Sequence, residues 1–462
     1  IMSGEALTYG EKQGFNPGAQ WQAGLSVVGG PHRLAEPIVK WSTQASSTDT
    51  LYQQIVSAGE LAQRMPAGPT FLCVPIETQL NEWHPPEELR VAPPRSRPHP
   101  PASEIEILTG LLLNSQNPAI VTENAGREVE GYTALVELAE LFGIPVIDGS
   151  QATYANFPKD HPLYQGVGQP AFLDECDVVL TIGCRAPWYP PSSKPKKAKI
   201  VAIDETPFRM HMVHQPVQAN MFLEGDTVAT LKLLAEALRA AGIDQSSVDA
   251  RKARWAAEHD ALMAERRAAE AEVAGNEAIH PRTLMAALGE NLPDNTFYVD
   301  ETISHHRIIL NHLQNKGPQS YFRGQGGLGQ GTGIALGAKL AAKDRPVVLI
   351  VGDGSFMYNP VLQSLALSKH ENLPILIIVS NNTGYSAMMN EHRAFYPDGD
   401  SAANDLFYGR DITDLEYSEI PKLFGGYGKR VEKAADLAGA LKEGLAAIES
   451  GRTAILNVMV DP

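Results

Sequence analysis

Two apolar stretches of the sequence, residues 347–351 and 375–379, each end in polar residues whose types suit a metal ion and a phosphate. Asp353 follows the first stretch and Asn382 follows the second. If both stretches are parallel strands, their carboxyl ends meet at one edge of a sheet, where ligands bind in open α/β folds. A carboxylate and an amide oxygen, completed by backbone carbonyl and diphosphate oxygens, are the hard ligands that Mg²⁺ prefers. The spacing therefore predicts a Mg²⁺ site that holds a diphosphate.

The two residues after Asp353 suit the phosphate itself. Gly354 and Ser355 would begin a helix, where backbone N–H groups and a hydroxyl can bind an anion. An apolar strand that ends in Gly-Asp-Gly fits a tight turn with a helix cap equally well. The second polar segment, which contains Asn381 and Asn382, shifts the balance toward a binding site.

Together the two segments resemble the binding motif for thiamine diphosphate (ThDP), in which Gly-Asp-Gly-Ser is followed by Asn-Asn after a helix and a strand. Other segments follow in the order and approximate spacing of the diphosphate-binding domain of the benzoylformate decarboxylase and acetolactate synthase family. They are residues 280–281, 300–302, 320–322, 326–329 and 381–385. Residues 103–245 look like the family's central domain, and residues 1–82 look like the last part of its pyrimidine-binding domain. The similarity thus covers essentially the whole chain.

The resemblance implies roles for the matching residues around the metal ion and the diphosphate. The side chains of Asp353 and Asn382 and the carbonyl of Gly384 would hold Mg²⁺. The diphosphate would be contacted by Gly354, Ser355, Tyr385 and Ser304. Where family members often carry a hydroxyl that contacts phosphate, this chain has Ile303.

Two more matching residues concern the rest of the cofactor. The carbonyl of Gly326 would accept a hydrogen bond from the 4'-amino group, and Leu328 would lie under the bent cofactor and force its two rings together. That geometry lets the imino nitrogen take the proton from C2, and the resulting carbon nucleophile attacks a carbonyl group. The protein would supply orientation and a dry cavity.

The substrate side of the site is expected to involve three further residues and one segment. Met388 matches a position that lines the substrate pocket, although a core methionine fits its helical spacing as well. His305 and His306 follow a predicted strand and would either donate a proton to the intermediate or serve as surface or capping residues. Residues 390–409 are polar, aromatic and glycine-containing, which suggests a mobile lid.

The resemblance implies a ThDP- and Mg²⁺-dependent enzyme that cleaves or forms a carbon–carbon bond next to a carbonyl. The expected type is a 2-oxo acid decarboxylase or carboligase, similar to benzoylformate decarboxylase or acetolactate synthase. The alternatives are an enzyme similar to 2-hydroxyacyl-CoA lyase or oxalyl-CoA decarboxylase, and a non-catalytic ThDP-binding subunit. The expected ligand is a small 2-oxo acid or acyl substrate. Because this family builds its active site between two chains, a homodimer or homotetramer is expected.

The family uses a glutamate early in the pyrimidine-binding domain to activate the cofactor. The sequence begins downstream of the matching position, and neither Glu5 nor Glu11 lies in a matching context. We therefore expect a longer natural polypeptide, the alternative being a catalytically impaired chain.

Composition excludes several other classes of protein. The formal net charge of the 462 residues is -16, which disfavours a nucleic-acid binder. The three cysteines Cys73, Cys176 and Cys184 form neither a disulfide framework nor a metal-binding spacing, which is typical of a reducing compartment. No apolar run is long enough for a membrane span, and no signal peptide is recognised, so we expect a cytoplasmic protein that does not bind membranes.

The elements that must position these residues alternate between helix and strand, which predicts parallel sheets covered by helices. Helices are predicted at residues 50–64, 105–113, 132–142, 227–241, 249–273, 281–288 and 360–369, and strands at 68–76, 118–122, 144–148, 178–183, 200–204, 296–299, 347–351 and 375–379. The expected fold is α/β with three doubly wound parallel-sheet units: a partial pyrimidine-binding domain, a Rossmann-like central domain and a diphosphate-binding domain.

The domain boundaries follow from breaks in this pattern. We expect the pyrimidine-binding part at residues 1–82, a proline-rich linker at 83–102, the central domain at 103–245, a connecting helix at 246–275 and the diphosphate-binding domain at 276–462. The glycine-rich stretch 324–337 is predicted to be a turn region. It is not a P-loop, because no Gly-Lys-Ser/Thr ends it.

Overall fold

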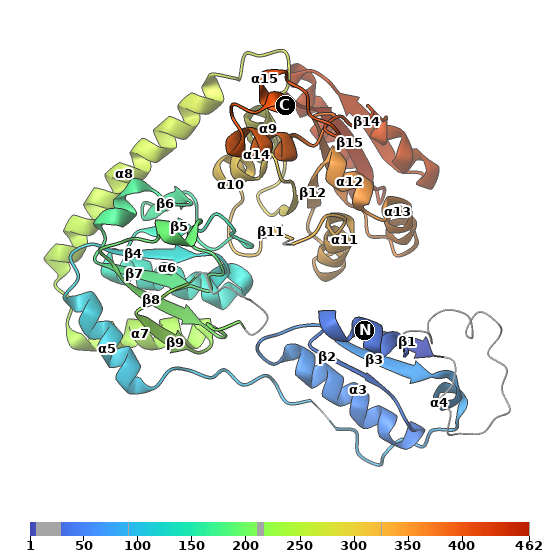
Figure 1. Ribbon diagram of the computed structural model, residues 1–462, viewed down its shortest axis with the longest axis horizontal. Coiled ribbons are helices and arrows are strands. Elements are labelled where there is room, and N and C mark those ends of the chain that lie inside the picture. Colours follow the sequence, from blue (N-terminus) through green and yellow to red (C-terminus); the bar gives the residue numbers. More distant parts are fainter. Residues whose placement is uncertain (6–28, 91, 210–216, 325, 462) are drawn as a thin grey trace. The chain divides into compact units, whose positions relative to one another are not determined.

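The computed structural model describes residues 1–5, 29–90, 92–209, 217–324 and 326–461. It contains three sheets, all of them parallel, with helices packed on their faces (Figure 1). The chain divides into two compact units, Ile1–His99 and Pro100–Pro462. The predicted α/β fold class is therefore confirmed. Within the described residues, no helix is both long enough and apolar enough to cross a bilayer.

The first unit contains a three-stranded parallel sheet in the order β1-β3-β2. Its elements are β1 (Met2–Glu5), α2 (Pro31–Ala35), β2 (Trp41–Gln44), α3 (Thr48–Gln63), β3 (Thr70–Pro75) and α4 (Ile76–Leu80). The central strand β3 is apolar and buried, and it confirms the strand predicted at 68–76. Ser47 caps α3 by accepting a hydrogen bond from the Asp49 N–H, which explains where the helix begins.

The second unit begins with a six-stranded sheet in the order β6-β5-β4-β7-β8-β9. Its strands are β4 (Pro118–Thr122), β5 (Val146–Asp148), β6 (Tyr164–Val167), β7 (Val178–Ile182), β8 (Lys199–Asp204) and β9 (Met221–Glu224). Its helices are α5 (Ala102–Leu113), α6 (Val129–Phe142) and α7 (Thr227–Ala241). The strand order reverses between β4 and β7, as in Rossmann-like folds.

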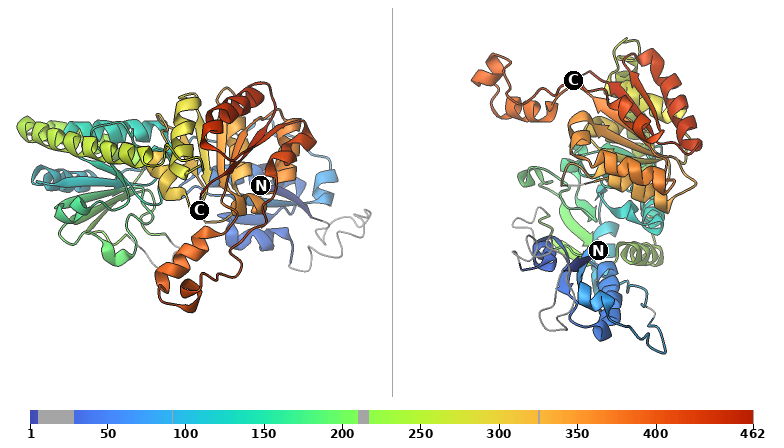
Figure 2. Two further views of the ribbon diagram at one scale, coloured as in Figure 1. Left: turned by 90° about the horizontal axis from the view of Figure 1, so that it is seen from above. Right: turned by 90° about the vertical axis from the view of Figure 1, so that its right-hand side faces the viewer.

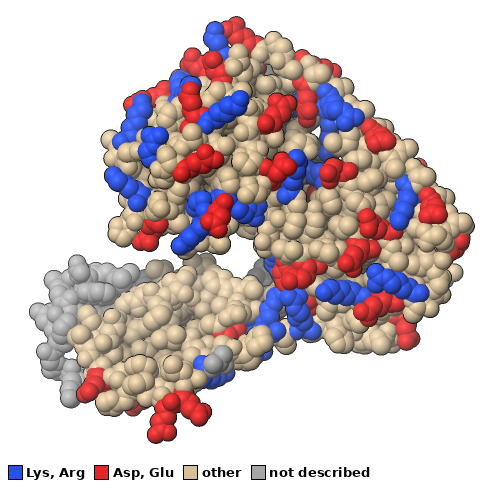
Figure 3. All heavy atoms as spheres, turned by 180° about the vertical axis from the view of Figure 1, so that it is seen from behind, with Lys and Arg blue, Asp and Glu red and all other residues tan. Residues whose placement is uncertain are grey.

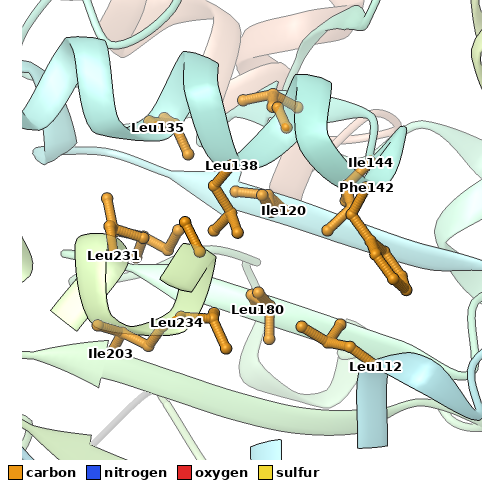
Figure 4. Packing of buried hydrophobic residues seen from close by; sticks show 14 of the residues in the cluster. Leu112, Ile120, Leu135, Leu138, Phe142, Ile144, Leu180, Ile203, Leu231 and Leu234 are labelled. Atoms are coloured by element: carbon orange, nitrogen blue, oxygen red, sulfur yellow. The ribbon is translucent and has the colours of Figure 1, made fainter. Parts of the chain in front are cut away.

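The core of this sheet is made of the apolar faces of its helices and strands. Leu135 and Leu138 on α6 and Leu231 on α7 pack with Ile120 of β4 and Leu180 of β7, and all five are fully buried (Figure 4). The helical spacing of the leucines and the uninterrupted apolar strands are what burial on both faces requires.

The long helix α8 (Gln245–Ala271) leads to a second six-stranded sheet, whose order is β11-β10-β12-β13-β15-β14. Its strands are β10 (Phe297–Glu301), β11 (Tyr321–Arg323), β12 (Val347–Gly352), β13 (Leu376–Asn381), β14 (Tyr427–Val431) and β15 (Ala454–Met459). Its helices are α9 (Pro281–Asn291), α10 (His306–His312), α11 (Gly331–Ala341), α12 (Asp353–Tyr358), α13 (Val361–His370), α14 (Ser386–Phe395), α15 (Asp400–Ala403) and α16 (Leu437–Glu449).

The glycine-rich stretch shows one clear difference from the predicted secondary structure. Residues 324 and 326–330 lie outside helices and strands, but α11 begins at Gly331. Ala335 and Leu336 of this helix are buried in the core that also contains β12 residues. Tertiary packing therefore outweighs the helix cost of the glycines, which is about 1 kcal/mol each. Each helix and strand predicted elsewhere is present, with bounds that differ by a few residues.

The sequence predicts a linker at residues 83–102 and a lid at residues 390–409, and the two segments differ in structure. Among the described residues between 82 and 101, none lies in a helix or strand. Residues 390–409, predicted to be a lid, contain most of α14 and all of α15, and this segment projects from the layered domain (Figure 2). Acidic and basic side chains are interspersed on the face of the molecule shown in Figure 3.

Candidate functional site

A cavity of about 250 Å³ lies at the carboxyl ends of β10, β12 and β13. The two central strands are in register so that Gly352 pairs with Ser380, which places the residues after each strand next to one another. All but two of the predicted site residues line this cavity: Ser304, His305, Leu328, Asp353, Gly354, Ser355, Asn382, Gly384, Tyr385 and Met388.

Asp353 is buried at the start of α12, directly after β12. Its Oδ1 accepts a hydrogen bond from the Gly354 N–H (2.9 Å), and its Oδ2 accepts one from the Gly384 N–H (3.1 Å). Burial raises the pKa of this carboxyl above its ordinary value, although the backbone hydrogen bonds act in the opposite direction. Over the described residues, no lysine, arginine or histidine lies within ion-pair distance of Asp353. A negative charge is thus held in a buried position that a cation would stabilise.

Asn382 follows β13 and faces the same cavity. Its Nδ2 donates to Ser386 Oγ at 2.9 Å, so the amide oxygen is the atom that can serve as a ligand. The adjacent loop is held by the segment after α15: the Tyr385 N–H donates to the Arg410 carbonyl (2.7 Å), and the Ile412 N–H donates to the Thr383 carbonyl (2.9 Å).

Two glycines at the site have no room for a side chain. A Cβ on Gly354 would lie 2.6 Å from Cε1 of Tyr385, and a Cβ on Gly384 would lie 3.0 Å from the Arg410 carbonyl oxygen. Glycine at these positions lets the Tyr385 ring and the Arg410 backbone pack closely against the segments that carry Asp353 and Asn382.

His305 lines the cavity from the start of α10. Its Nδ1 lies 3.0 Å from Ser380 Oγ. Burial, with a smaller contribution from His280, lowers the pKa of His305 to about 4, so the imidazole is neutral at pH 7. A neutral imidazole in a cavity can accept or donate a proton according to its tautomer.

His306 points away from the cavity. Its Nδ1 lies 3.2 Å from Asp300 Oδ2, and its Nε2 lies 3.1 Å from the carbonyl oxygen of Ser150 in the central domain. Asp300 also accepts a hydrogen bond from the Tyr321 hydroxyl (2.8 Å). Burial would raise the pKa of Asp300, but hydrogen bonding to His306 and the charges of His306 and Arg323 hold it below its ordinary value. Both ring nitrogens of His306 are thus engaged between the two sheets.

Gly326 is the other predicted residue outside the cavity lining. It has a positive φ of 90°, and a Cβ placed on it would have no heavy atom within 4 Å. Leu328, two residues later, lines the cavity and is 41% exposed. Met388 lies on α14 and is 64% exposed, so it is a wall of the cavity and not a core methionine.

Sequence reasoning assigned no site role to three polar residues of the lining, Thr302, Ser380 and Tyr358. Ser380 could have been found, because it directly follows the apolar stretch 375–379. Tyr358 comes from the end of α12, and no local pattern marked it. It hydrogen-bonds with Tyr385, and burial together with this contact raises the pKa of Tyr385.

Comparison with known protein families agrees with this geometry. Residues 302–458 match the family described as "Thiamine pyrophosphate enzyme, C-terminal TPP binding domain". Residues 105–234 match the family described as "Thiamine pyrophosphate enzyme, central domain". The cavity lies within the first of these matches.

Curated relatives and solved structures are similar over most of the chain. Benzoylformate decarboxylase of Pseudomonas aeruginosa is 26% identical over 441 residues, which cover 90% of this chain and 75% of that protein. The acetolactate synthase large subunit of Mycobacterium tuberculosis is 28% identical over 468 residues, which cover 97% of this chain and 79% of that protein. The structure of a ThDP-dependent 4-hydroxybenzoylformate decarboxylase from Rhodococcus jostii is alike in fold, with a TM-score of 0.74 at 22% identity, and the match covers 93% of this chain and 78% of that one.

Proposed function

The chain belongs to the ThDP-dependent enzymes related to benzoylformate decarboxylase and acetolactate synthase, and we propose that it uses ThDP and Mg²⁺ to cleave or form a carbon–carbon bond next to a carbonyl. The main support for this proposal is that Asp353 and Asn382 follow adjacent strands and line the same cavity. The substrate would be a small 2-oxo acid or acyl compound.

The residues at the site fit a divalent cation bound to a diphosphate. Asp353 provides a buried carboxylate without a basic partner among the described residues, and Asn382 provides an amide oxygen. With the carbonyl of Gly384, they would supply the oxygen ligands that Mg²⁺ prefers. Gly354, Ser355, Tyr385 and Ser304 line the same cavity as candidate phosphate contacts.

When bound, ThDP supplies a nucleophilic carbon and an electron sink, which are the chemical requirements for breaking or making such a bond. The chain's own residues orient the reactants and exclude water. Leu328 and Met388 provide apolar walls of the cavity. The carbonyl of Gly326 remains our candidate acceptor for the aminopyrimidine, although Gly326 does not line the cavity in this structure.

Proton transfer is assigned to His305. Its Nδ1 is next to Ser380 Oγ, so Nε2 is the ring atom available to exchange a proton with the substrate. Because burial lowers the pKa of His305 to about 4, the side chain is neutral at the start of the reaction. His306 is not included, since both of its ring nitrogens are engaged between the sheets.

The proposal is tested by calorimetric titration of the purified chain with ThDP, with and without Mg²⁺, followed by assays of CO₂ release from benzoylformate and pyruvate. We expect saturable ThDP binding that requires Mg²⁺, and turnover of a 2-oxo acid. Binding without turnover would favour the non-catalytic subunit, and no binding would contradict the proposal. Light scattering on the same sample is expected to show a homodimer or homotetramer. The exposed Phe395, Tyr396 and Tyr408, which lie at and after the end of α14, suit such an assembly.

A further inference from the structure

Glu301 is a buried carboxylate that does not line the cavity but holds the loop beside it. It is the last residue of β10 and is 6% exposed. Its Oε1 accepts hydrogen bonds from the N–H groups of Gly329 (2.5 Å) and Gln330 (2.8 Å). Its Oε2 accepts from the Gly331 N–H (3.0 Å) and from Asn359 Nδ2 (2.7 Å). Both oxygens therefore have two donors each.

The loop is shaped to allow this contact. A Cβ on Gly331 would lie 2.6 Å from Glu301 Oε2, and Gly329 has a φ of +91° with the Tyr358 carbonyl oxygen 2.5 Å from the position of a Cβ. Side chains at either position would displace the loop from the carboxylate. Glycine fits at these two positions because Glu301 lies close to Gly331 and the end of α12 lies close to Gly329.

Asn359 extends the contact to the helix that begins with Asp353. It follows α12 directly, and its Nδ2 also donates to the Ser355 carbonyl at 2.9 Å. Its Oδ1 accepts from the Thr332 N–H at 2.9 Å, in the first turn of α11. Glu301 and Asn359 thus join the start of α11 to the end of α12.

The charge of Glu301 is balanced by dipoles. In the part of the chain that the structure describes, no basic side chain forms an ion pair with it. Its partners are three backbone N–H groups at the start of the 11-residue helix α11 and one amide side chain. Both carboxylate oxygens are thus fully hydrogen-bonded by these donors.

We propose that Glu301 is a positioning residue that fixes the 328–331 loop, so that Leu328 is held at the cavity before any ligand binds. This inference rests on the proposed function, because it assigns the held loop to the ThDP site. Glu301 acts through Leu328 and through Asn359, and it does not touch the ligand itself. Without the carboxylate, three backbone N–H groups lose their acceptor and the loop opens locally.

The first test uses Glu301→Gln in the absence of ThDP and Mg²⁺. Glutamine keeps the shape but offers one acceptor oxygen, and its NH₂ group faces an N–H donor. We expect hydrogen exchange of residues 329–331 to be at least about tenfold faster than in the unmodified chain, with exchange in β13 unchanged. Glu419→Gln, at a carboxylate that is 62% exposed, is the matched control and should change neither segment. Unchanged exchange at 329–331 would overturn the proposal.

A second variant covers the case in which Glu301→Gln does not fold. Gly331→Ala keeps the carboxylate but adds a methyl group at a clashing position, and it should increase exchange at the same three residues. If Gly331→Ala folds and leaves their exchange unchanged, the anchoring role is wrong.

ThDP titration in saturating Mg²⁺ then separates positioning from a purely structural role. We expect either variant to weaken ThDP binding by about tenfold or more, while the domain that contains β13 keeps its melting temperature. Faster loop exchange with unchanged ThDP affinity would overturn the role at the cofactor site. If the unmodified chain binds no ThDP, the proposed function fails, while the exchange measurement still decides whether Glu301 anchors the loop.

Discussion

The substitution Asp353→Asn should separate cofactor binding from folding. Asparagine has nearly the same shape, so the change removes the charge at the proposed metal site. Two unit charges 4 Å apart interact by about 4 kcal/mol at an effective dielectric constant of 20. Mg²⁺ carries two charges, so 4 kcal/mol is a low figure, and it corresponds to about a 10³-fold loss of affinity. We therefore expect Mg²⁺-dependent ThDP binding to fall by at least about 10²-fold.

The stability of the ligand-free protein should change much less. Burial raises the pKa of Asp353, so its ionised form is disfavoured in the folded state and its contribution to stability is lost as pH rises through the folded pKa. Asparagine removes this cost, but it leaves one of the two N–H donors, Gly354 or Gly384, without an oxygen acceptor. The two effects oppose each other, and we expect the free energy of unfolding to change by less than about 2 kcal/mol.

The assay is calorimetric titration with ThDP in excess Mg²⁺, paired with urea unfolding of the ligand-free protein. Asp294→Asn, at a carboxylate that is 73% exposed, serves as the control and should leave binding unchanged. An affinity of Asp353→Asn within about threefold of the unmodified chain would refute the metal assignment. A large loss of stability together with lost binding would show that Asp353 serves the fold instead.

Two further predictions concern buried ionisable groups. His305→Asn should lower kcat by about 10²-fold or more while ThDP affinity is retained. Because burial lowers the pKa of His305 to about 4, the unmodified enzyme should show no loss of rate from His305 protonation between pH 5 and 8. Steady-state kinetics over pH check both predictions, and an unchanged kcat would contradict the assignment. Burial lowers the pKa of Lys159 to about 7, so between about pH 7 and 10 the unfolded chain binds more protons than the folded protein, and stability should rise with pH over that range. Lys159→Met should flatten this rise and lower the free energy of unfolding, measured in urea, by about 3 kcal/mol. An unaltered slope of stability against pH would contradict the reasoning.

The sequence predicted those parts of the site that depend on strand ends. Apolar stretches identified β12 and β13, and polar residues that directly follow parallel strands must share one edge of the sheet. Asp353 and Asn382 could therefore be placed together before the structure was known. Their register, with Gly352 opposite Ser380, confirmed that the two strands are adjacent.

The remaining features depend on packing that the sequence does not express locally. Residues 331–337 contain three glycines and read as a turn, but burial of Leu336 makes the segment helical. The edge strands β6, β9, β11 and β14 are short and were not predicted. The buried interior strand β15 was also missed, as were β1 and β2 of the first unit. Glu301 was seen only as part of the resemblance to a family, because its four partners come from segments 28 or more residues away.

The two adjacent histidines show why side-chain direction was the hardest feature to predict. Successive residues of a helix point about 100° apart, so the sequence alone does not say which of His305 and His306 faces the cavity. The central domain decides between them, because the Ser150 carbonyl lies 3.1 Å from Nε2 of His306. At the other end of α10, Lys159 Nζ donates to the carbonyls of Leu310 (2.8 Å) and Leu313 (2.9 Å).

Both ends of α10 are therefore held by the central domain. The helix is only seven residues long, so a shift at either end would move its N-terminal residue. His305 directly precedes this helix, so its place in the cavity depends on the position of α10. Among its described residues, the central domain contributes no side chain to the cavity lining, yet its contact with His306 leaves His305 as the histidine that faces the cavity. A change at Lys159 should therefore affect proton transfer as well as stability, even though its Nζ donates to backbone carbonyls at the far end of α10.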